Sequence, residues 1–108
     1  MTDQALSDVK VVEWGSFISA PFCAKLMADM GAEVIKVEPP GTGDEARRNG
    51  PFPKDIPDQE KSGLFLYLNT NKYGVTLDMT KPAGKEAFLK LIKDTDIYVQ
   101  NHPYETVK

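Results

Sequence analysis

The chain has 108 residues, 41% hydrophobic and 27% charged, a composition typical of one globular domain and too short for a second complete one. Thirteen Lys and Arg against 16 Asp and Glu give a net charge of −3, which lacks the basic footprint of a nucleic-acid-binding protein. No apolar run approaches the roughly 20 residues that span a bilayer, and the first residues lack the blocks of a signal peptide. We therefore expect a cytoplasmic protein without nucleic-acid or membrane partners.

The single cysteine and the single histidine limit the chemistry of the chain. Cys23 has no second thiol for a disulfide or a metal cluster, and its apolar neighbours at helical spacing predict a core position. His102 is the one imidazole on which a nucleophile and base pair would have to be built. We therefore expect neither a metal site nor a catalytic residue within these 108 residues.

The first elements predicted along the chain are a strand, a helix and a second strand. Residues 9–14 are mostly β-branched and stop at Gly15, which predicts a strand. Ser19 as N-cap, Pro21 in the first turn and Gly31 at the end predict a helix. Its apolar face comprises Phe22, Cys23, Leu26, Met27 and Met30. Residues 33–38 alternate polar and apolar side chains, so they predict a second strand parallel to the first.

Residues 39–73 predict a long irregular loop, because they hold five of the eight prolines and four of the eight glycines. Within it, residues 64–68 are apolar and predict a short helix or strand. Residues 74–79 predict a third strand, and Thr80 predicts the cap of a helix with Pro82 in its first turn. That helix has an apolar face of Ala87, Phe88, Leu91 and Ile92, and a solvated face of Lys85, Lys90 and Lys93. Residues 97–99 predict the last strand.

These elements predict an α/β fold with a Rossmann-like parallel sheet and flanking helices, in a single unit over residues 1–108. Ligands of such sheets bind beyond the carboxyl ends of the strands, where helix starts favour anions such as phosphate. Four segments fall there: residues 15–19, the loop that opens at Pro39, residues 78–80 and residues 101–103. The carboxylates of Glu38, Asp44 and Asp78 at these loop entrances are explained by capping, turns or solvation.

Common nucleotide-binding motifs are missing from these segments. Residues 41–46 match a loose G-x-G-x-x-A spacing, but the polar residues that follow them do not form the apolar helix that a dinucleotide site requires. The chain contains no G-x-x-x-x-G-K-[ST] sequence. The phosphate-bearing ligand is therefore expected to bind in another way.

Seven segments in order resemble one known family. They are residues 6–13, 20–23, 26–38, 43–48, 68–72, 75–79 and 96–101, and they include Ala-Asp-Met-Gly-Ala-Glu-Val-Ile-Lys-Val-Glu at 28–38. In this order they resemble the N-terminal part of the family III coenzyme A transferases, which include formyl-CoA transferase, carnitine CoA-transferase and the α-methylacyl-CoA racemases. The resemblance covers nearly the whole chain.

The resemblance implies a site for coenzyme A, used as a substrate thioester and not as a permanently bound cofactor. Matched by position, the CoA-binding residues are Ile18, Ser19, Leu77, Asp78, Met79, Thr80, Asn101 and His102. The partners implied are an acyl-CoA and a carboxylic acid acceptor, and the family's full-length enzymes form interlocked homodimers. Their nucleophile is an aspartate that would fall beyond Lys108, so the resemblance implies an N-terminal fragment.

Three positions depart from formyl-CoA transferase, and two other functions remain open. Ile18 stands where that enzyme has Gln, Pro39 where it has Arg, and His102 where the family commonly has Phe, so the resemblance does not extend to formyl or oxalate specificity. One alternative is a racemase or epimerase that moves a proton through acid and base residues outside this chain. The other is a non-catalytic CoA-binding or assembly module.

Overall fold

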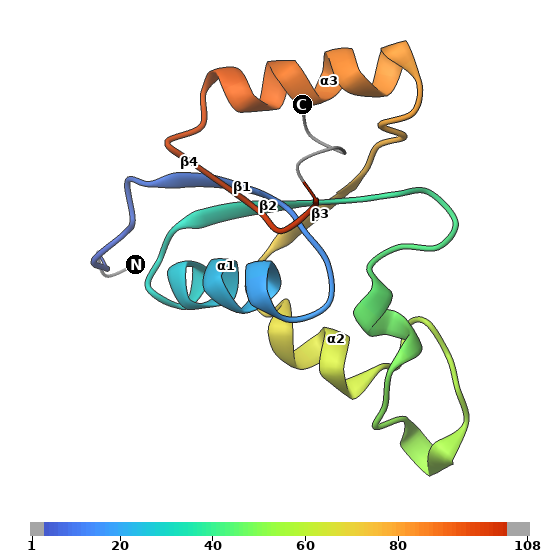
Figure 1. Ribbon diagram of the computed structural model, residues 1–108. Helices are drawn as coiled ribbons and strands as arrows, with labels where there is room; N and C mark the ends of the chain where they lie inside the picture. Colours follow the sequence, from blue (N-terminus) through green and yellow to red (C-terminus); the bar gives the residue numbers. More distant parts are fainter. Residues whose placement is uncertain (1–3, 104–108) are drawn as a thin grey trace.

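The computed structural model describes residues 4–103, which form a four-stranded parallel sheet between helices (Figure 1). The strands are β1 (Lys10–Trp14), β2 (Glu33–Glu38), β3 (Tyr73–Thr76) and β4 (Ile97–Gln100), in the order β3-β2-β1-β4. Helices α1 (Ser19–Asp29) and α2 (Gly63–Leu68) lie on one side of the sheet and α3 (Pro82–Lys93) on the other. The predicted α/β fold with a parallel sheet is therefore confirmed.

The two central strands are buried on both faces, which explains their valines. On one face Val11 and Val34 pack with Ala24 and Ala28 of α1. On the other face Val12 and Val37 pack with Phe88 of α3. Each of these fully buried valines contributes on the order of 2 kcal/mol to folding. The core is thus two apolar layers, one on each side of β1 and β2.

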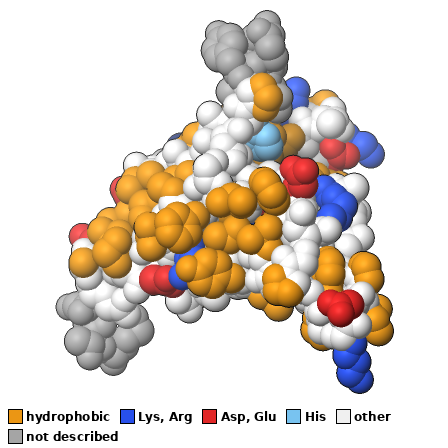
Figure 2. Space-filling view, turned by 60° about the horizontal axis from the view of Figure 1, so that its bottom comes forward, with side chains coloured by type: hydrophobic (Ala, Val, Ile, Leu, Met, Phe, Trp, Pro, Cys, Tyr) orange, Lys and Arg blue, Asp and Glu red, His pale blue; other side chains and the backbone are white. Residues whose placement is uncertain are grey.

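Helix α1 packs on the sheet mainly by a different face from the one predicted, although Met27 of the predicted face does pack against the core. Its buried residues are Ala20, Pro21, Ala24 and Ala28, whereas Cys23 is exposed and Phe22, Leu26 and Met30 are each at least 40% exposed. The expected core position of Cys23 is therefore wrong. Small side chains let the helix approach the sheet closely, and its larger ones join those of α2 on the surface, where Figure 2 shows hydrophobic side chains gathered. Gly31 follows the helix with a φ of 101°, as the sequence predicted.

Neither predicted hydroxyl caps its helix. Helix α1 begins after Ile18 and α3 after Lys81, and no side chain caps either one. The Ser19 hydroxyl instead accepts a hydrogen bond from Asn101, and the Thr80 hydroxyl bonds to Asp78. The Ser19 hydroxyl therefore connects the start of α1 to the segment after β4, whereas the Thr80 hydroxyl closes a turn within the loop after β3. Pro82 does occupy the first turn of α3.

The segment 39–73 contains more regular structure than the sequence indicated. It holds two short 3-10 helices, Glu45–Arg48 and Pro53–Asp55, and its apolar residues form α2. Ser62 is buried, donates a hydrogen bond to the Ala46 carbonyl at 2.8 Å and accepts one from the Phe65 amide. Strand β3 begins at Tyr73 and ends at Thr76, so Leu77, Asp78 and Met79 lie in the loop that follows it. No helix within residues 4–103 is long and apolar enough to cross a membrane.

Candidate functional site

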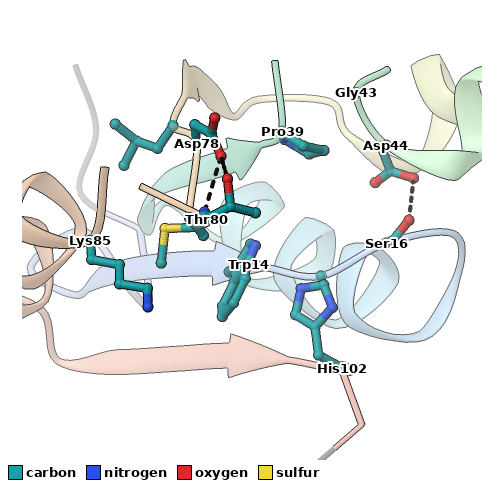
Figure 3. Close-up of a pocket in the computed structure, with 12 residues that line it drawn as sticks. Trp14, Ser16, Pro39, Gly43, Asp44, Asp78, Thr80, Lys85 and His102 are labelled. Atoms are coloured by element: carbon teal, nitrogen blue, oxygen red, sulfur yellow. Dashed lines mark hydrogen bonds between the residues drawn. The ribbon is translucent and has the colours of Figure 1, made fainter. Parts of the chain in front are cut away.

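A cavity of about 410 Å³ lies at the carboxyl ends of the strands (Figure 3). The connections from β1 to β2 and from β3 to β4 run on opposite faces of the sheet, so β1 and β4 flank the point where the strand order reverses. Ligands of open parallel sheets bind in the crevice at such a point. The lining of the cavity comes from the end of β1 and from the segments after all four strands. These residues are Trp14 of β1, Gly15 and Ser16 after it, Pro39, Gly43 and Asp44 after β2, Leu77, Asp78, Met79 and Thr80 after β3, Lys85 of α3, and His102 after β4.

Five of the eight residues that the resemblance implied line this cavity, namely Leu77, Asp78, Met79, Thr80 and His102. Asn101 lies beside it, and its amide is used inside the protein: Oδ1 accepts from the Ser16 N–H at 3.0 Å, and Nδ2 donates to the Ser16 carbonyl and the Ser19 hydroxyl. Ile18 is 46% exposed, and neither it nor Ser19 lines the cavity. The structure thus gathers the residues after β3 with His102, and Asn101 connects β4 to the loop after β1.

A tight turn after β3 forms one wall of the cavity. The Asp78 carboxylate accepts hydrogen bonds from the Thr80 hydroxyl and the Thr80 N–H, and the Asp78 carbonyl accepts one from Lys81. The Thr80 hydroxyl and amide hold the pKa of Asp78 below its usual value, so its carboxylate is ionised at neutral pH. Gly84 of α3 packs so closely that a Cβ there would lie 2.0 Å from the Asp78 carbonyl oxygen. This glycine therefore allows the wall to rest on α3.

An aromatic pair forms the opposite wall. The rings of Trp14 and His102 have centroids 4.2 Å apart, and Trp14 also packs against Phe88 at 5.6 Å. Burial lowers the pKa of His102, against the opposing effects of Glu13 and a hydrogen bond with the Trp14 backbone. The imidazole is therefore neutral at physiological pH. This wall offers flat apolar surface with one polar ring.

A buried network of charges supports the site from beneath α1, and sequence reasoning missed it. Glu13 and Lys36 are register partners on β1 and β2, and the Lys36 Nζ lies 2.8 Å from Glu13 Oε2 and 2.6 Å from Asp44 Oδ2. The Lys72 Nζ lies 2.9 Å from Glu13 Oε1 and 3.0 Å from the Pro21 carbonyl. The four charged side chains are at most 2% exposed and balance as two acids and two bases. The sequence signal that could have revealed this network is one acidic and one basic residue, Glu13 and Lys36, within two strands that are otherwise rich in valine.

Asp44 joins this network to two loops that line the cavity. Its Oδ1 accepts hydrogen bonds at 2.8 Å from the N–H groups of Phe17 and Ala46, and at 3.3 Å from the Ser16 hydroxyl. Burial alone would raise the pKa of Asp44, but Lys36 and these N–H groups outweigh burial and lower it. Phe17 adopts a φ of 68°, which is strained for a non-glycine residue, and its N–H bond to Asp44 holds that conformation. Asp44 is therefore an ionised positioning residue and not a base for Ser16.

Arg47, one of the basic residues in the resemblance, is used structurally. It forms a two-pronged ion pair with Glu38 in which both N to O distances are 2.8 Å, and its guanidinium stacks 3.7 Å from the centroid of the Phe65 ring. Glu38 also accepts a hydrogen bond from the Asp44 N–H at 2.7 Å. Among the described residues that line the cavity, the one Lys or Arg is Lys85, which the sequence assigned to a solvated helix face.

The chemistry of the site is that of binding. Its walls combine aromatic and apolar side chains with one cation near the first turn of α3, where helix geometry favours an anion. The carboxylates of the cavity are ionised and are held by Lys36 or by the Asp78–Thr80 turn. Within residues 4–103 no cluster of His, Cys, Asp and Glu is arranged to hold a metal ion.

Comparison with known proteins identifies the family of this chain. Residues 6–108 match the model of CoA-transferase family III. The chain is 38% identical over 104 residues to a succinyl-CoA:mesaconate CoA-transferase of Haloarcula hispanica, and 44% identical over 98 residues to a formyl-CoA:oxalate CoA-transferase of Afipia carboxidovorans. These alignments cover 96% and 91% of this chain, and 26% and 22% of the relatives.

The structural comparison agrees. A crystal structure of a CAIB/BAIF family protein from Brucella suis superposes with a TM-score of 0.86 at 28% identity, over 98% of this chain and 28% of that one. The chain thus spans about a quarter of the length of the proteins it matches. Because the family model matches almost every residue, the chain belongs to CoA-transferase family III.

Proposed function

We propose that the protein functions in the transfer of coenzyme A from an acyl-CoA to a carboxylic acid, and that the cavity of this chain binds CoA. The observation that carries the proposal is the position of the cavity. It lies at the carboxyl ends of all four strands, where the strand order of the sheet reverses. Family membership supports it, and the relatives named above are CoA-transferases, which favours transfer over racemisation. We propose Leu77, Asp78, Met79, Thr80 and His102 as direct contacts. We propose that Ile18, Ser19 and Asn101 belong to the segments that border the bound ligand.

The cavity walls suit the parts of CoA. Trp14, Pro39, Leu77 and Met79 offer apolar surface for the adenine or the pantetheine chain. Lys85 and the start of α3 favour a phosphate group, because a helix start carries partial positive charge. The ligand is a substrate thioester in this proposal, and no permanently bound cofactor is required.

We place the chemical steps on an aspartate outside these 108 residues, since the cavity's own carboxylates are engaged by internal ion pairs and hydrogen bonds. The aspartate oxygen attacks the acyl-CoA carbonyl and the C–S bond breaks. CoA departs as thiolate, and the acyl group remains on the aspartate as a mixed anhydride. The thiolate then attacks the aspartyl carbonyl, which releases the donor carboxylate and forms an aspartyl thioester. The acceptor carboxylate attacks this thioester, the C–S bond breaks, and CoA departs as thiolate from a second mixed anhydride. The thiolate then attacks the acceptor's carbonyl, which forms the new acyl-CoA and releases the aspartate carboxylate. This chain binds and orients CoA throughout. The resemblance to the family supports a cytoplasmic homodimer as the working form.

Calorimetric titration of the 108-residue protein with CoA tests the binding proposal. We expect saturable binding that weakens several-fold in Lys85→Met, because the substitution removes the cavity's cation and keeps most of the side chain's length. The matched control is Lys90→Met, because Lys90 lies on the same helix and outside the cavity lining. Absence of binding at millimolar CoA, or an equal loss in both variants, contradicts the proposal. Turnover of acyl-CoA and carboxylate by this chain alone would contradict the placement of the nucleophile.

A further inference from the structure

One buried polar atom belongs to a residue that lines the cavity and has no partner among the described residues. The Nε2 of His102 is buried, and it makes no hydrogen bond to any described residue. Buried polar atoms in native proteins are nearly always paired, because an unpaired one loses its hydrogen bonds to water without replacement. His102 lines the cavity (Figure 3), so a bound ligand can supply the missing partner.

The imidazole is held in place for such a contact. Its ring packs against Trp14 with centroids 4.2 Å apart, and the His102 backbone N–H donates to the Gln100 side chain at 2.6 Å. A ring fixed on one face by an aromatic neighbour loses little further freedom when a ligand binds. The atom is therefore unpaired, and its ring is held against Trp14 beside the cavity.

The surroundings of the ring favour its neutral form. Burial disfavours the imidazolium, while Glu13 opposes this effect from β1. The other charged groups that line the cavity are Asp44, Asp78 and Lys85, from three different segments. Asp44 is paired with Lys36 and Asp78 with the Thr80 turn, so neither carboxylate offers the ring an ion pair. A neutral imidazole nitrogen donates or accepts one hydrogen bond without forming an ion pair.

We propose that His102 determines ligand specificity through a hydrogen bond between its Nε2 and an uncharged polar group of the bound CoA thioester. The amino group of adenine and the amides of pantetheine share this chemistry. The inference rests on the proposed function, because it assumes CoA in the cavity. The imidazole of His102 can form a hydrogen bond to the ligand, whereas a phenylalanine ring at this position could only pack against it.

The test compares CoA binding by the wild type, His102→Phe and His102→Gln. The Phe variant keeps a flat ring against Trp14 and removes both nitrogens, so we expect about tenfold weaker CoA binding, equivalent to about 1.4 kcal/mol. The Gln variant keeps a polar group and recovers part of the loss. Tyr98→Phe is the matched control, since it removes a hydroxyl on β4 outside the cavity lining and leaves CoA affinity unchanged. Titration with adenosine 3′,5′-bisphosphate and with pantetheine identifies which half of CoA carries the contact.

Nuclear magnetic resonance of the wild type gives a second readout that needs no variant. His102 is the single histidine of the chain, so ring ¹⁵N labelling yields one imidazole to follow. We expect its Nε2 resonance to move on CoA binding while the ring stays neutral at pH 7. An unmoved resonance, a ring that becomes charged, or undiminished affinity in His102→Phe overturns the inference while the proposed function stands. A wild type that binds no CoA overturns both.

Discussion

At the scale of single residues, the site depends on charged groups buried where the sequence looks ordinary. Lys36 lies between Glu13 and Asp44, and it joins the centre of the sheet to the loops that line the cavity. Burying a charge is costly unless it is paired, so each member of this network depends on the others. Asp44 also holds the strained Phe17 backbone through an N–H bond. Its carboxylate therefore links stability to the shape of the site.

Asp44→Asn is expected to lower the free energy of unfolding by about 3 kcal/mol. The substitution removes one of the two carboxylates that pair with the buried Lys36, so that Glu13 is the one that remains. Urea denaturation at pH 7 measures the change. Asp58→Asn, in the same segment but exposed, serves as the control and should change stability by no more than about 0.5 kcal/mol. Equal effects of the two substitutions would show that the Asp44–Lys36 pair contributes little.

The lowered pKa of His102 predicts a pH dependence of stability. Because burial keeps the folded-state pKa below that of the unfolded chain, the unfolded state binds more protons as the pH falls below about 6.5. The free energy of unfolding should therefore decrease between pH 7.5 and pH 5.5. Asp44 and Glu38, whose pKa values are lowered, stay ionised in this range and do not contribute. Urea denaturation of His102→Phe should lack this decrease, and an identical pH profile would contradict the assignment.

At the scale of elements, α1 and α3 use their apolar residues differently. Helix α3 buries Phe88 of its predicted face, whereas α1 buries its alanines and leaves Phe22 and Leu26 largely exposed. Apolar spacing predicts that a helix has a face but not which face meets the sheet when small residues offer a closer fit. Close approach also decides glycine positions, as Gly84 shows where α3 meets the cavity wall.

Gly84→Ala is expected to destabilise the protein by about 1–3 kcal/mol, although alanine is the better helix former by about 1 kcal/mol. The added Cβ would lie 2.0 Å from the Asp78 carbonyl oxygen and would push the Asp78–Thr80 turn into the cavity. Thermal unfolding and CoA titration measure the two consequences. Gly74→Ala on β3 has no atom within 4 Å of the new Cβ and should be neutral or slightly stabilising. Higher stability of Gly84→Ala would exclude the predicted contact.

At the scale of the whole molecule, the order β3-β2-β1-β4 makes the site, because it brings the ends of segments far apart in the chain to one edge. The turn after β3, the residues after β4 and the loop after β1 meet only once the sheet has formed. Burial is deepest at β1 and β2, which are paired on both sides and covered by helices on both faces.

Native-state hydrogen exchange should follow this arrangement. Amides of β1 and β2 are expected to exchange only through global unfolding, since no smaller opening exposes them. Amides of β3 and β4, each paired with one neighbour among the described strands, should exchange through smaller openings and faster. Mass spectrometry or NMR under native conditions measures the rates. Equal protection of all four strands would mean that the sheet opens as one unit.

The sequence by itself determined the four strands and the helices α1 and α3, and their order along the chain. The β-branched runs, Gly31 and Pro82 act through local backbone preferences, so the strand-helix-strand unit and the start of α3 follow from short segments. The family resemblance likewise picked out Leu77 to Thr80 and His102, which the fold brings to one cavity. Local patterns did not foresee the role of Ser19, because Asn101, which is distant in sequence, supplies its hydrogen bond. The Thr80 hydroxyl bonds to Asp78 two residues before it and does not cap α3.

Only the tertiary structure decided which groups are buried together. Glu13, Lys36, Asp44 and Lys72 read as ordinary charges along the chain, and their pairing depends on strand register and on a loop that folds back over the sheet. The buried face of α1 and the unpaired His102 Nε2 likewise depend on packing between distant segments. Burial and charge compensation are properties of three-dimensional neighbours, whereas propensity and capping are properties of adjacent residues.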